Sequence, residues 1–362
     1  MAVVDLQINY PVLGGQRVEL SRHLREALDE SSEWMTPAPY GGLEKHRKIA
    51  AEWMSREGAP ISTSRVMISA GGHIAVMAAL LAAELRGRKI AVDRITYPGF
   101  KEQAAALGAV LVPCEMDERG MTAESLERAA KEHGAAAAYL MPTVHNPLGI
   151  VMPMERRRQI CEVAARHNLV LIEDDAYRFC EANPPATFAT LAPERSYFVE
   201  SLTKPIAPVM KVGFLVFPED RAVAVTTALR MLANGAPVLL AEVATRLIAS
   251  GDLDRLLAAK RAEAKVRQRI AAEIFAGLDV TAHPTSFHLW LELPERQSAD
   301  AIAATLNREE VLVSPSSESV AAADVRANGM RVALGAIRDL NDLRKGLERV
   351  RKVIDEAAAK AV

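Results

Sequence analysis

The sequence predicts an α/β protein with two domains: a larger three-layer α/β/α domain around a mostly parallel sheet, and a smaller α+β domain. Its 362 residues allow about two domains at roughly 150 residues each. Short, β-branched apolar runs in the middle of the chain lack polar alternation, as expected of strands that are buried on both faces. Helical patterns separate these runs, which favours parallel strands joined by crossover helices.

Predicted strands and helices alternate over the central part of the chain. The strands cover residues 65–69, 89–93, 109–113, 137–142, 168–175, 196–202 and 212–218. After about residue 235 the pattern changes to a long helical stretch, roughly 239 to 275, and then to a hairpin-like pair of strands within residues 279–294. We therefore expect a large domain over residues 41–240 and a small domain over residues 1–40 and 241–362.

The composition favours a cytoplasmic protein that binds neither nucleic acid nor membrane. Lys plus Arg total 44 against 46 Asp plus Glu, a formal net charge of −2, which lacks the basic excess of a nucleic-acid binder. Cys114, Cys161 and Cys180 lie far apart without a metal-ligand spacing, so we expect free thiols and no metal site. The N-terminus lacks the basic region of a signal peptide, and the richest apolar segment, Ile74 to Leu85, is too short to cross a bilayer.

Two predicted strands end in residues that can perform chemistry. Lys204 follows the strand at 196–202, and a lysine held against apolar surroundings can become a nucleophile for an imine, although most lysines are solvated surface groups. Ser201 and Thr203 precede it and offer hydroxyls for a phosphate or for ending the strand. Asp174 ends the strand in LVLIEDDAY, where it could stabilise a protonated ring nitrogen while Tyr177 donates to a phenolate. The same pattern also suits a turn closed by an Asx-type hydrogen bond.

Three other strand ends favour the binding of a phosphate and a flat ring. Gly71 and Gly72 stand between a strand and a helix, where helix-start amides can bind a phosphate, although such a turn is more often simply tight. Asn146 lies between two prolines, which present its amide rigidly. Tyr97 follows another strand, and its ring could stack on a cofactor or pack in the core.

In their order and intervals, these residues resemble the fold-type I pyridoxal-phosphate enzymes, specifically the class I/II aminotransferases. The resemblance covers nearly the whole chain, from PYGGLEKHRKIAAEWM (39–54), similar to the segment that precedes the large domain, to GMRVALGA near the C-terminus. The residues that match the family's motifs are Asn146 of NP-x-G, Asp174 and Tyr177 of D-x-x-Y, Ser201 and Lys204 of the Schiff-base segment, and Arg331 of the C-terminal segment.

The resemblance implies a role for each residue around the cofactor ring. Lys204 would form the internal aldimine with pyridoxal 5'-phosphate (PLP) and then carry the proton between substrate and cofactor. Asp174 would face the pyridine nitrogen and keep it protonated, so that the ring accepts electrons. Asn146 and Tyr177 would hydrogen-bond the phenolic oxygen of the ring, and Tyr97 would stack on it. The Asn146–Pro147 peptide bond is expected to be cis.

The same resemblance implies how phosphate and substrate are bound. Arg331, together with Asn146, would bind the substrate, the guanidinium taking its α-carboxylate in a bidentate pair. Tyr40 would reach the phosphate of a neighbouring subunit, because the family builds its sites across a homodimer interface. The residues expected around the chain's own phosphate site are Gly71, Gly72, His73, Ser201, Thr203 and Lys211.

The chain departs from the family pattern at several positions. Lys211 stands where arginine is usual, and a lysine loses the planar fork that grips a phosphate. His73 stands where glutamine is common, and SPSSES (314–319) replaces a Pro-Gly segment. We expect these changes to affect substrate and rate more than the cofactor.

We therefore expect an aminotransferase that moves the α-amino group of an amino acid to a 2-oxo acid by a ping-pong mechanism. The substrate would be a neutral or aromatic amino acid, with 2-oxoglutarate or pyruvate as acceptor. A β- or γ-lyase, an oxidase or a cyclase stays open, because such enzymes share Lys204, Asp174 and Arg331. The chain also resembles the aminotransferase-like domain of MocR-type regulators. Those carry an N-terminal winged helix, whereas the family segment here begins within the first ten residues, so we favour the enzyme.

Overall fold

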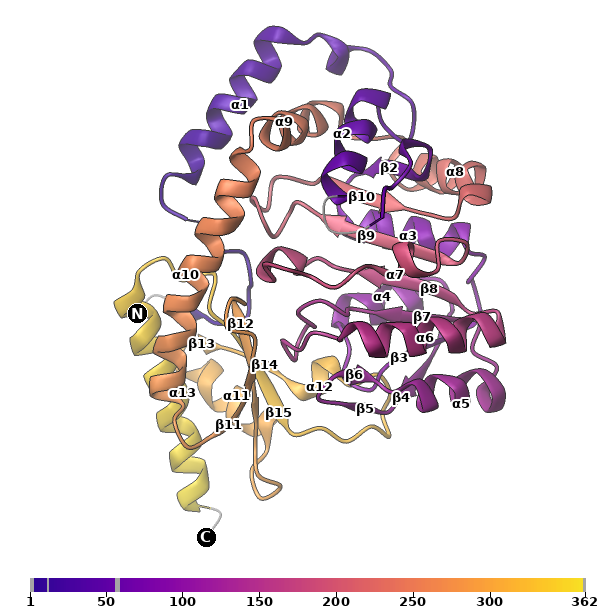
Figure 1. Ribbon diagram of the computed structural model, residues 1–362. Coiled ribbons are helices and arrows are strands. Elements are labelled where there is room, and N and C mark those ends of the chain that lie inside the picture. Colours follow the sequence, from indigo (N-terminus) through magenta and orange to yellow (C-terminus); the bar gives the residue numbers. More distant parts are fainter. Residues whose placement is uncertain (1–2, 12, 56–58, 361–362) are drawn as a thin grey trace.

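The computed structural model of the protein describes residues 3–11, 13–55 and 59–360. A seven-stranded sheet with helices on both faces forms its larger part, and a four-stranded sheet with its own helices lies beside it (Figure 1). The predicted α/β fold, with a large three-layer part and a smaller α+β part, is confirmed.

The seven-stranded sheet is mostly parallel, as predicted. Only β10 runs antiparallel, to both of its neighbours, while the other strand pairs are parallel. Because the loop between β9 and β10 is too short for a crossover helix, β10 must return antiparallel to β9. In spatial order the strands are β2 (Val66–Ser69), β10 (Gly213–Val216), β9 (Ser196–Ser201), β8 (Val170–Asp174), β7 (Ala137–Leu140), β3 (Lys89–Asp93) and β4 (Val110–Cys114).

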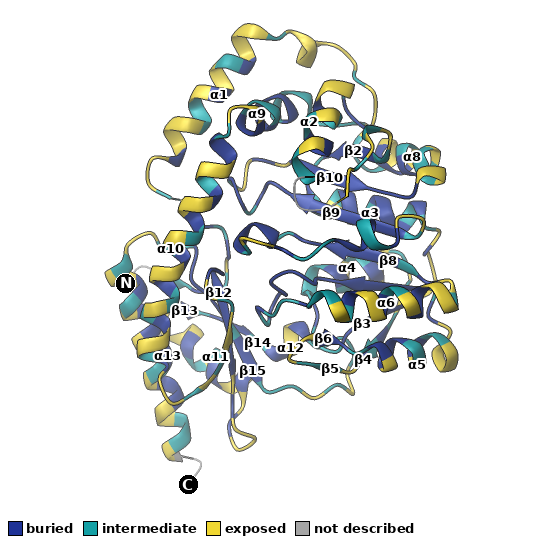
Figure 2. Cartoon of the chain, in the orientation of Figure 1, coloured by how far each residue is buried: buried dark blue, intermediate teal, exposed yellow. Residues whose placement is uncertain are grey.

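Helices cover both faces of this sheet, and two separate hydrophobic cores lie between the layers. One core contains Phe100 and Leu229 together with the strand residue Tyr139, and the other contains Ile160 together with the next strand residue, Leu140. This alternation along β7 is the period of two expected of a strand that is buried on both faces. Figure 2 shows that the strands of the large sheet are mostly buried, whereas the outer faces of its helices are exposed. The helices on the first face are α3 (Gly72–Ala82), α4 (Pro98–Ala106) and α8 (Ala222–Ala233), and those on the second are α5 (Ala123–His133), α6 (Met154–His167) and the short α7 (Phe188–Leu191).

The long helical stretch predicted over 239–275 is two helices. Helix α9 (Val238–Ala249) is followed by α10 (Asp252–Ile274), and the break falls at Gly251, whose φ of 74° is in the left-handed region that glycine adopts without strain. Apart from this glycine, the helix propensities of the stretch indicate no break, so the sequence did not predict it. Helix α2 (Glu44–Met54) packs against α9.

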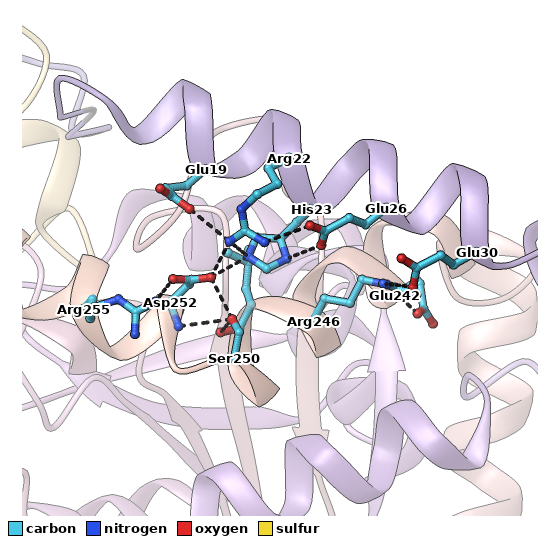
Figure 3. A network of polar contacts seen from close by, with 11 residues as sticks. Glu19, Arg22, His23, Glu26, Glu30, Glu242, Arg246, Ser250, Asp252 and Arg255 are labelled. Atoms are coloured by element: carbon cyan, nitrogen blue, oxygen red, sulfur yellow. Dashed lines mark hydrogen bonds and ion pairs between the residues drawn. The ribbon is translucent and has the colours of Figure 1, made fainter.

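A network of charged side chains connects α1 (Gln16–Glu30) to α9 and α10 (Figure 3). Asp252, the first residue of α10, has its Oδ2 at 2.6 Å from the Arg22 guanidinium and at 2.8 Å from Nε2 of His23. A second ion pair joins Arg246 of α9 to Glu30 at 2.8 Å. The network fixes α1, and with it the chain that precedes α1, on the larger part of the molecule.

The smaller part is built on an antiparallel sheet. Its predicted hairpin is present, because β11 pairs antiparallel with β12. The N-terminal strand β1 pairs with β13, and Leu6, which follows β1, is fully buried in the core of this part. Where the two domains divide, at 41–240 against 1–40 and 241–362, stays a prediction. The elements are β1 (Val4–Asp5), β11 (Asp279–Ala282), β12 (His288–Glu292), α11 (Ala299–Arg308), β13 (Val311–Leu312), β14 (Ser314–Pro315), α12 (Ser316–Ser319), β15 (Gly329–Ala333) and α13 (Leu340–Lys360).

Among the described residues, no single helix combines the length and apolar character that a bilayer span needs. One pair of helices, Glu219–Ala233 and Val238–Ala249, meets the requirement by length and composition together, with a bend of 118° between them. Cys114, Cys161 and Cys180 are free thiols, as expected from their spacing.

Candidate active site

A cavity of about 470 Å³ lies between the ends of the large-sheet strands, the N-terminal segment and the small sheet. Strands β7, β8 and β9 open into it with their carboxyl ends, the place where open α/β sheets bind ligands. Residues 7–10 and Arg331 of β15 close it from the other side. Every site residue predicted from the sequence except Tyr40 lines this cavity: Gly71, Gly72, His73, Tyr97, Asn146, Asp174, Tyr177, Ser201, Thr203, Lys204, Lys211 and Arg331.

Lys204 follows β9 and extends its amine into the cavity. The amine donates to the carbonyl oxygen of Asn9 at 3.1 Å and lies 3.6 Å from the centre of the Tyr10 ring. Burial lowers the pKa of Lys204 to about 7, with further lowering by the cations Arg331 and Lys211. A sizeable fraction of the amine is therefore uncharged near neutral pH and able to attack a carbonyl carbon.

Of the three carboxylates at the end of β8, Asp174 is the one aimed into the cavity. Glu173 points the other way and pairs with the buried Arg157 at 2.9 Å. Asp175 pairs with Arg178 at 3.0 Å. Asp174 lines the cavity, and burial raises its pKa to about 6. A cationic group entering the cavity would stabilise the charged form of this carboxylate.

The first turn of α3 and the loop around Lys204 form a cradle that fits a phosphate. Gly71 caps α3 with a φ of 98°, and no side chain caps the helix, so its first amides are free to bind an anion. A Cβ on Gly72 would lie 3.0 Å from Cβ of Ser201, so the cradle accepts only glycine there without a shift. Thr203 accepts a hydrogen bond from Ser201 at 3.0 Å, and Lys211 supplies a cation on the same side of the cavity.

Three tyrosines line the cavity, of which Tyr177 is buried and Tyr10 and Tyr97 are half-buried. The Tyr97 hydroxyl lies 2.8 Å from Nε2 of His73, which fixes both side chains. Burial raises the pKa of Tyr177 to about 12, although the nearby Arg331 opposes the rise, so this phenol stays a neutral hydrogen-bond donor. Stacking of Tyr97 on a cofactor ring stays a prediction.

Arg331 enters the cavity from β15, and three hydrogen-bond partners hold its guanidinium in place. Its guanidinium donates to Oδ1 of Asn146 at 2.9 Å, to the carbonyl oxygen of Gln7 at 2.8 Å and to Ser314 at 3.2 Å. Its Nε is buried without a hydrogen-bond partner. The Asn146–Pro147 peptide bond is cis, as expected. A guanidinium held in this position can form a bidentate ion pair with a carboxylate.

Tyr40 is the one predicted site residue that lies outside the cavity. It is 38% exposed, next to Gly235, with the Arg230 guanidinium 5.9 Å from its ring centre. A contact of Tyr40 with the phosphate of a neighbouring subunit stays a prediction.

Sequence reasoning missed several residues at the site, and four of them contact Lys204 or Asp174. Asn9 and Tyr10 reach Lys204 from a segment far away in the sequence, and Tyr139 donates to Asp174 at 2.8 Å from within a strand. Lys260 of α10 is fully buried, and its amine donates to the carbonyl oxygens of Pro11, Lys204 and Ile206. Only Lys260 left a signal, because it falls on the apolar stripe of its helix with Leu253, Leu257 and Ala264.

The comparison with known families matches nearly the whole sequence. The family model for aminotransferase class I and II covers residues 2–350. The chain belongs to the class I and II aminotransferase family. Pyridoxal phosphate is the cofactor of this family, and the phosphate cradle, Lys204 and Asp174 are a donor set that fits it.

Similar family members include both enzymes and regulators. The chain is 28% identical over 91% of its length to an uncharacterized HTH-type transcriptional regulator, YdeF of Bacillus subtilis, and spans 71% of that protein. It is 24% identical over 82% of its length to a 2-aminoadipate transaminase of Thermus thermophilus, and spans 75% of it. It is also 24% identical over 78% of its length to the HTH-type transcriptional regulator TauR of Rhodobacter capsulatus, of which it spans 59%.

Solved structures of aminotransferases share the fold of this family member. An archaeal alanine:glyoxylate aminotransferase superposes with a TM-score of 0.89 at 20% identity, over 98% of this chain and 91% of the other. The kynurenine aminotransferase of Pyrococcus horikoshii superposes with the same TM-score at 21% identity, over 98% and 91% of the two chains. These likenesses establish the fold-type I architecture.

Proposed function

We propose that this protein is a PLP-dependent aminotransferase that moves the α-amino group of an amino acid to a 2-oxo acid. The observation that carries the proposal is the content of one cavity: an amine with a lowered pKa (Lys204), a carboxylate free to meet a cationic ring (Asp174) and a fork for a carboxylate (Arg331). Transamination needs all three groups in one place.

Each residue has a defined task in this reaction. Lys204 would hold the aldehyde end of the cofactor through its amine and would carry a proton to and from the substrate α-carbon. Asp174 would hold a proton at the pyridine nitrogen. Asn146 accepts from Arg331 through Oδ1, so its Nδ2 would donate to the phenolic oxygen of the cofactor, as would the Tyr177 hydroxyl. Bound PLP supplies the electron sink for the bond that breaks at the α-carbon.

The lining of the cavity supports a neutral or aromatic amino acid as substrate. Ile8, Tyr10, Ile74 and Met141 contribute apolar surface, and Arg331 is the one guanidinium that lines the cavity within the described parts of the chain. A second carboxylate on the substrate would find no fork there. We propose 2-oxoglutarate or pyruvate as the acceptor.

We further propose that the enzyme works as a cytoplasmic homodimer with shared active sites. Trp34, Met35 and Tyr40 lie in one stretch of chain, and each exposes at least a third of its surface. The chain around Tyr40 runs beside the edge strand β2, to which Gly41 bonds. Exposed apolar groups that gather on one face favour an interface.

The test is a half-reaction with the purified, cofactor-loaded protein. Neutral, aromatic and acidic amino acids are added in turn, and absorbance follows the conversion of the aldehyde form of the cofactor to its amine form, then its return on adding a 2-oxo acid. Conversion with return establishes transamination, and Lys204→Ala should abolish it. The matched control is Lys265→Ala, an exposed lysine of α10, which should leave the half-reaction unchanged.

Two other functions predict different results in the same experiment. A β- or γ-lyase would release ammonia without accumulating the amine form. The similarity to HTH-type regulators favours a second candidate, an effector-binding domain that holds the cofactor and an amino acid without turnover. Such a domain would change the spectrum on binding the amino acid, but a 2-oxo acid would not restore the starting form.

A further inference from the structure

Tyr139 has a place in the site that neither its sequence context nor the family pattern assigned. It lies on β7, the strand that neighbours β8 in parallel register, with Tyr139 opposite Ile172. Its hydroxyl donates to Oδ2 of Asp174 at 2.8 Å, and the ring is 1% exposed. Its ring stacks face to face on Phe100, with centres 3.5 Å apart and planes within 6°. Strand, core and stack thus fix the position of the hydroxyl.

The direction of this hydrogen bond is set by the surroundings. Burial and the negative charge of Asp174 raise the pKa of Tyr139 well above its usual value, so the phenol keeps its proton and donates. Asp174 accepts through Oδ1 from the amide of Ala176 at 3.3 Å. The carboxylate is therefore held by two neutral donors, unlike Glu173 and Asp175, each of which meets an arginine.

Four ionisable groups face Asp174 from the elements around it. They are Tyr139 of β7, Asp175 beside it, Tyr97 at the start of α4 and Lys204 after β9. Burial raises the pKa of Asp174, and the Tyr139 hydrogen bond opposes that rise. A donor to the carboxylate lowers its affinity for a proton, so a proton shared with a ring nitrogen then lies on the nitrogen.

We propose that Tyr139 is a positioning residue for Asp174, whose hydroxyl orients the carboxylate and keeps the shared proton on the pyridine nitrogen of the cofactor. This proposal rests on the proposed function, because it assigns Asp174 to the cofactor ring. The proton comes from solvent when the cofactor binds, and Asp174 stays an anion throughout. Without the hydroxyl, the proton moves toward Asp174, the ring nitrogen becomes neutral and the ring accepts electrons less well.

The decisive variant is Tyr139→Phe, because it removes one oxygen and keeps the ring stacked on Phe100. The matched control is Tyr197→Phe, a tyrosine of β9 that is 2% exposed and does not line the cavity. A merely structural tyrosine would affect thermal stability alone. A positioning tyrosine would also change the protonation of the cofactor, which stability measurements do not report.

The readout is the 15N chemical shift of the ring nitrogen in protein loaded with 15N-labelled PLP, followed from pH 5 to pH 9. We expect the Tyr139→Phe resonance to move toward that of an unprotonated pyridine, since a hydrogen bond to a charged group is worth about tenfold in an equilibrium. We also expect kcat to fall about tenfold with little change in KM, as for an interaction that matters only in the transition state. The Tyr197→Phe spectrum should match that of the unchanged protein.

An unchanged 15N shift and pH profile in Tyr139→Phe would overturn the proposal. If that variant does not fold, Phe100→Leu loosens the stack while keeping the hydroxyl, and it must move the resonance in the same direction by a smaller amount. Adding Tyr139→Phe to Asp174→Asn should produce no further change if Tyr139 acts through Asp174. The 15N readout needs only a bound cofactor, so failure of the proposed transamination would leave this test independent.

Discussion

At the scale of single residues, the site depends on the environment of one amine. Lys204 loses proton affinity because it is buried and because two cations, Arg331 and Lys211, share its cavity. Lys260 helps to hold the backbone of Lys204 in place, because its amine donates a hydrogen bond to the carbonyl oxygen of Lys204. Burial lowers the pKa of Lys260 to about 7 as well, although the nearby Cys180 opposes this.

This environment predicts the pH at which the cofactor-free protein captures PLP. Below a pKa of about 7 the Lys204 amine is protonated and cannot add to the aldehyde, so the capture rate should rise through pH 7 and level off above pH 8. Arg331→Gln removes a repelling cation, so the midpoint should move to higher pH by roughly half a unit to one unit. Stopped-flow absorbance with PLP alone measures the rate. A midpoint near 10, the value of a solvated lysine, would contradict the prediction, and Lys265→Met is the control.

Some of the site residues could be predicted from the sequence, and others could not. Parallel strands bring their carboxyl ends to one edge, which is why residues as far apart as Tyr97 and Lys204 could be expected together and are found together. The sequence could not separate Asp174 from its two acidic neighbours by chemistry alone, because the arginines that neutralise those neighbours come from other elements. The role of Tyr139 could not be predicted for the same reason, because its hydrogen-bond partner, Asp174, lies on the neighbouring strand β8.

At the scale of elements, α1 is attached to the molecule by Ala27, which is buried in the large core, and by a network of charged side chains around Asp252. Asp252 is buried, yet hydrogen bonds from Ser250, His23 and Arg22 outweigh the effect of burial and hold its pKa below the usual value. The break at Gly251 is what places Asp252 at the start of a helix, where a carboxylate is favourable. The sequence predicted a long helical stretch here, without the break and therefore without such a site.

Asp252→Asn should detach α1 partially. The variant leaves the exposed Arg255 without this carboxylate and Arg22 with only Glu19 and Glu26 as partners, so we expect a loss of roughly 1 kcal/mol in the free energy of unfolding. The contribution of Asp252 exists above its unfolded pKa of about 4 and disappears as the pH falls through its lower folded pKa. The difference between variant and parent should therefore be full at pH 7 and shrink below pH 4. Urea unfolding at pH 7 and at a pH below 4 measures this difference in the free energy of unfolding. The control is Glu348→Gln, at an exposed position of α13.

At the scale of the whole molecule, the chain beside one edge of the large sheet carries exposed apolar groups. Trp34 and Met35 are 36% and 70% exposed, and the chain reaches from them to β2, the first strand of the sheet. Trp34 also borders a surface groove with Pro237 and Leu239 at the start of α9. The opposite edge strand, β4, exposes Val110 at 53%, which gives a matched apolar residue far from this face.

Met35→Asp should therefore weaken the proposed dimer, because it places a charge in an apolar interface where it would be desolvated without a partner. We expect at least a tenfold rise in the dimer dissociation constant, an effect of about 1.4 kcal/mol, measured by sedimentation at several concentrations. Val110→Asp should leave the constant unchanged. Because Tyr40 is proposed to complete the neighbouring phosphate site, the Met35→Asp protein should also bind PLP more weakly at low protein concentration and recover when concentrated. A parent protein that sediments as a monomer at all concentrations, with full cofactor affinity, would exclude the shared site.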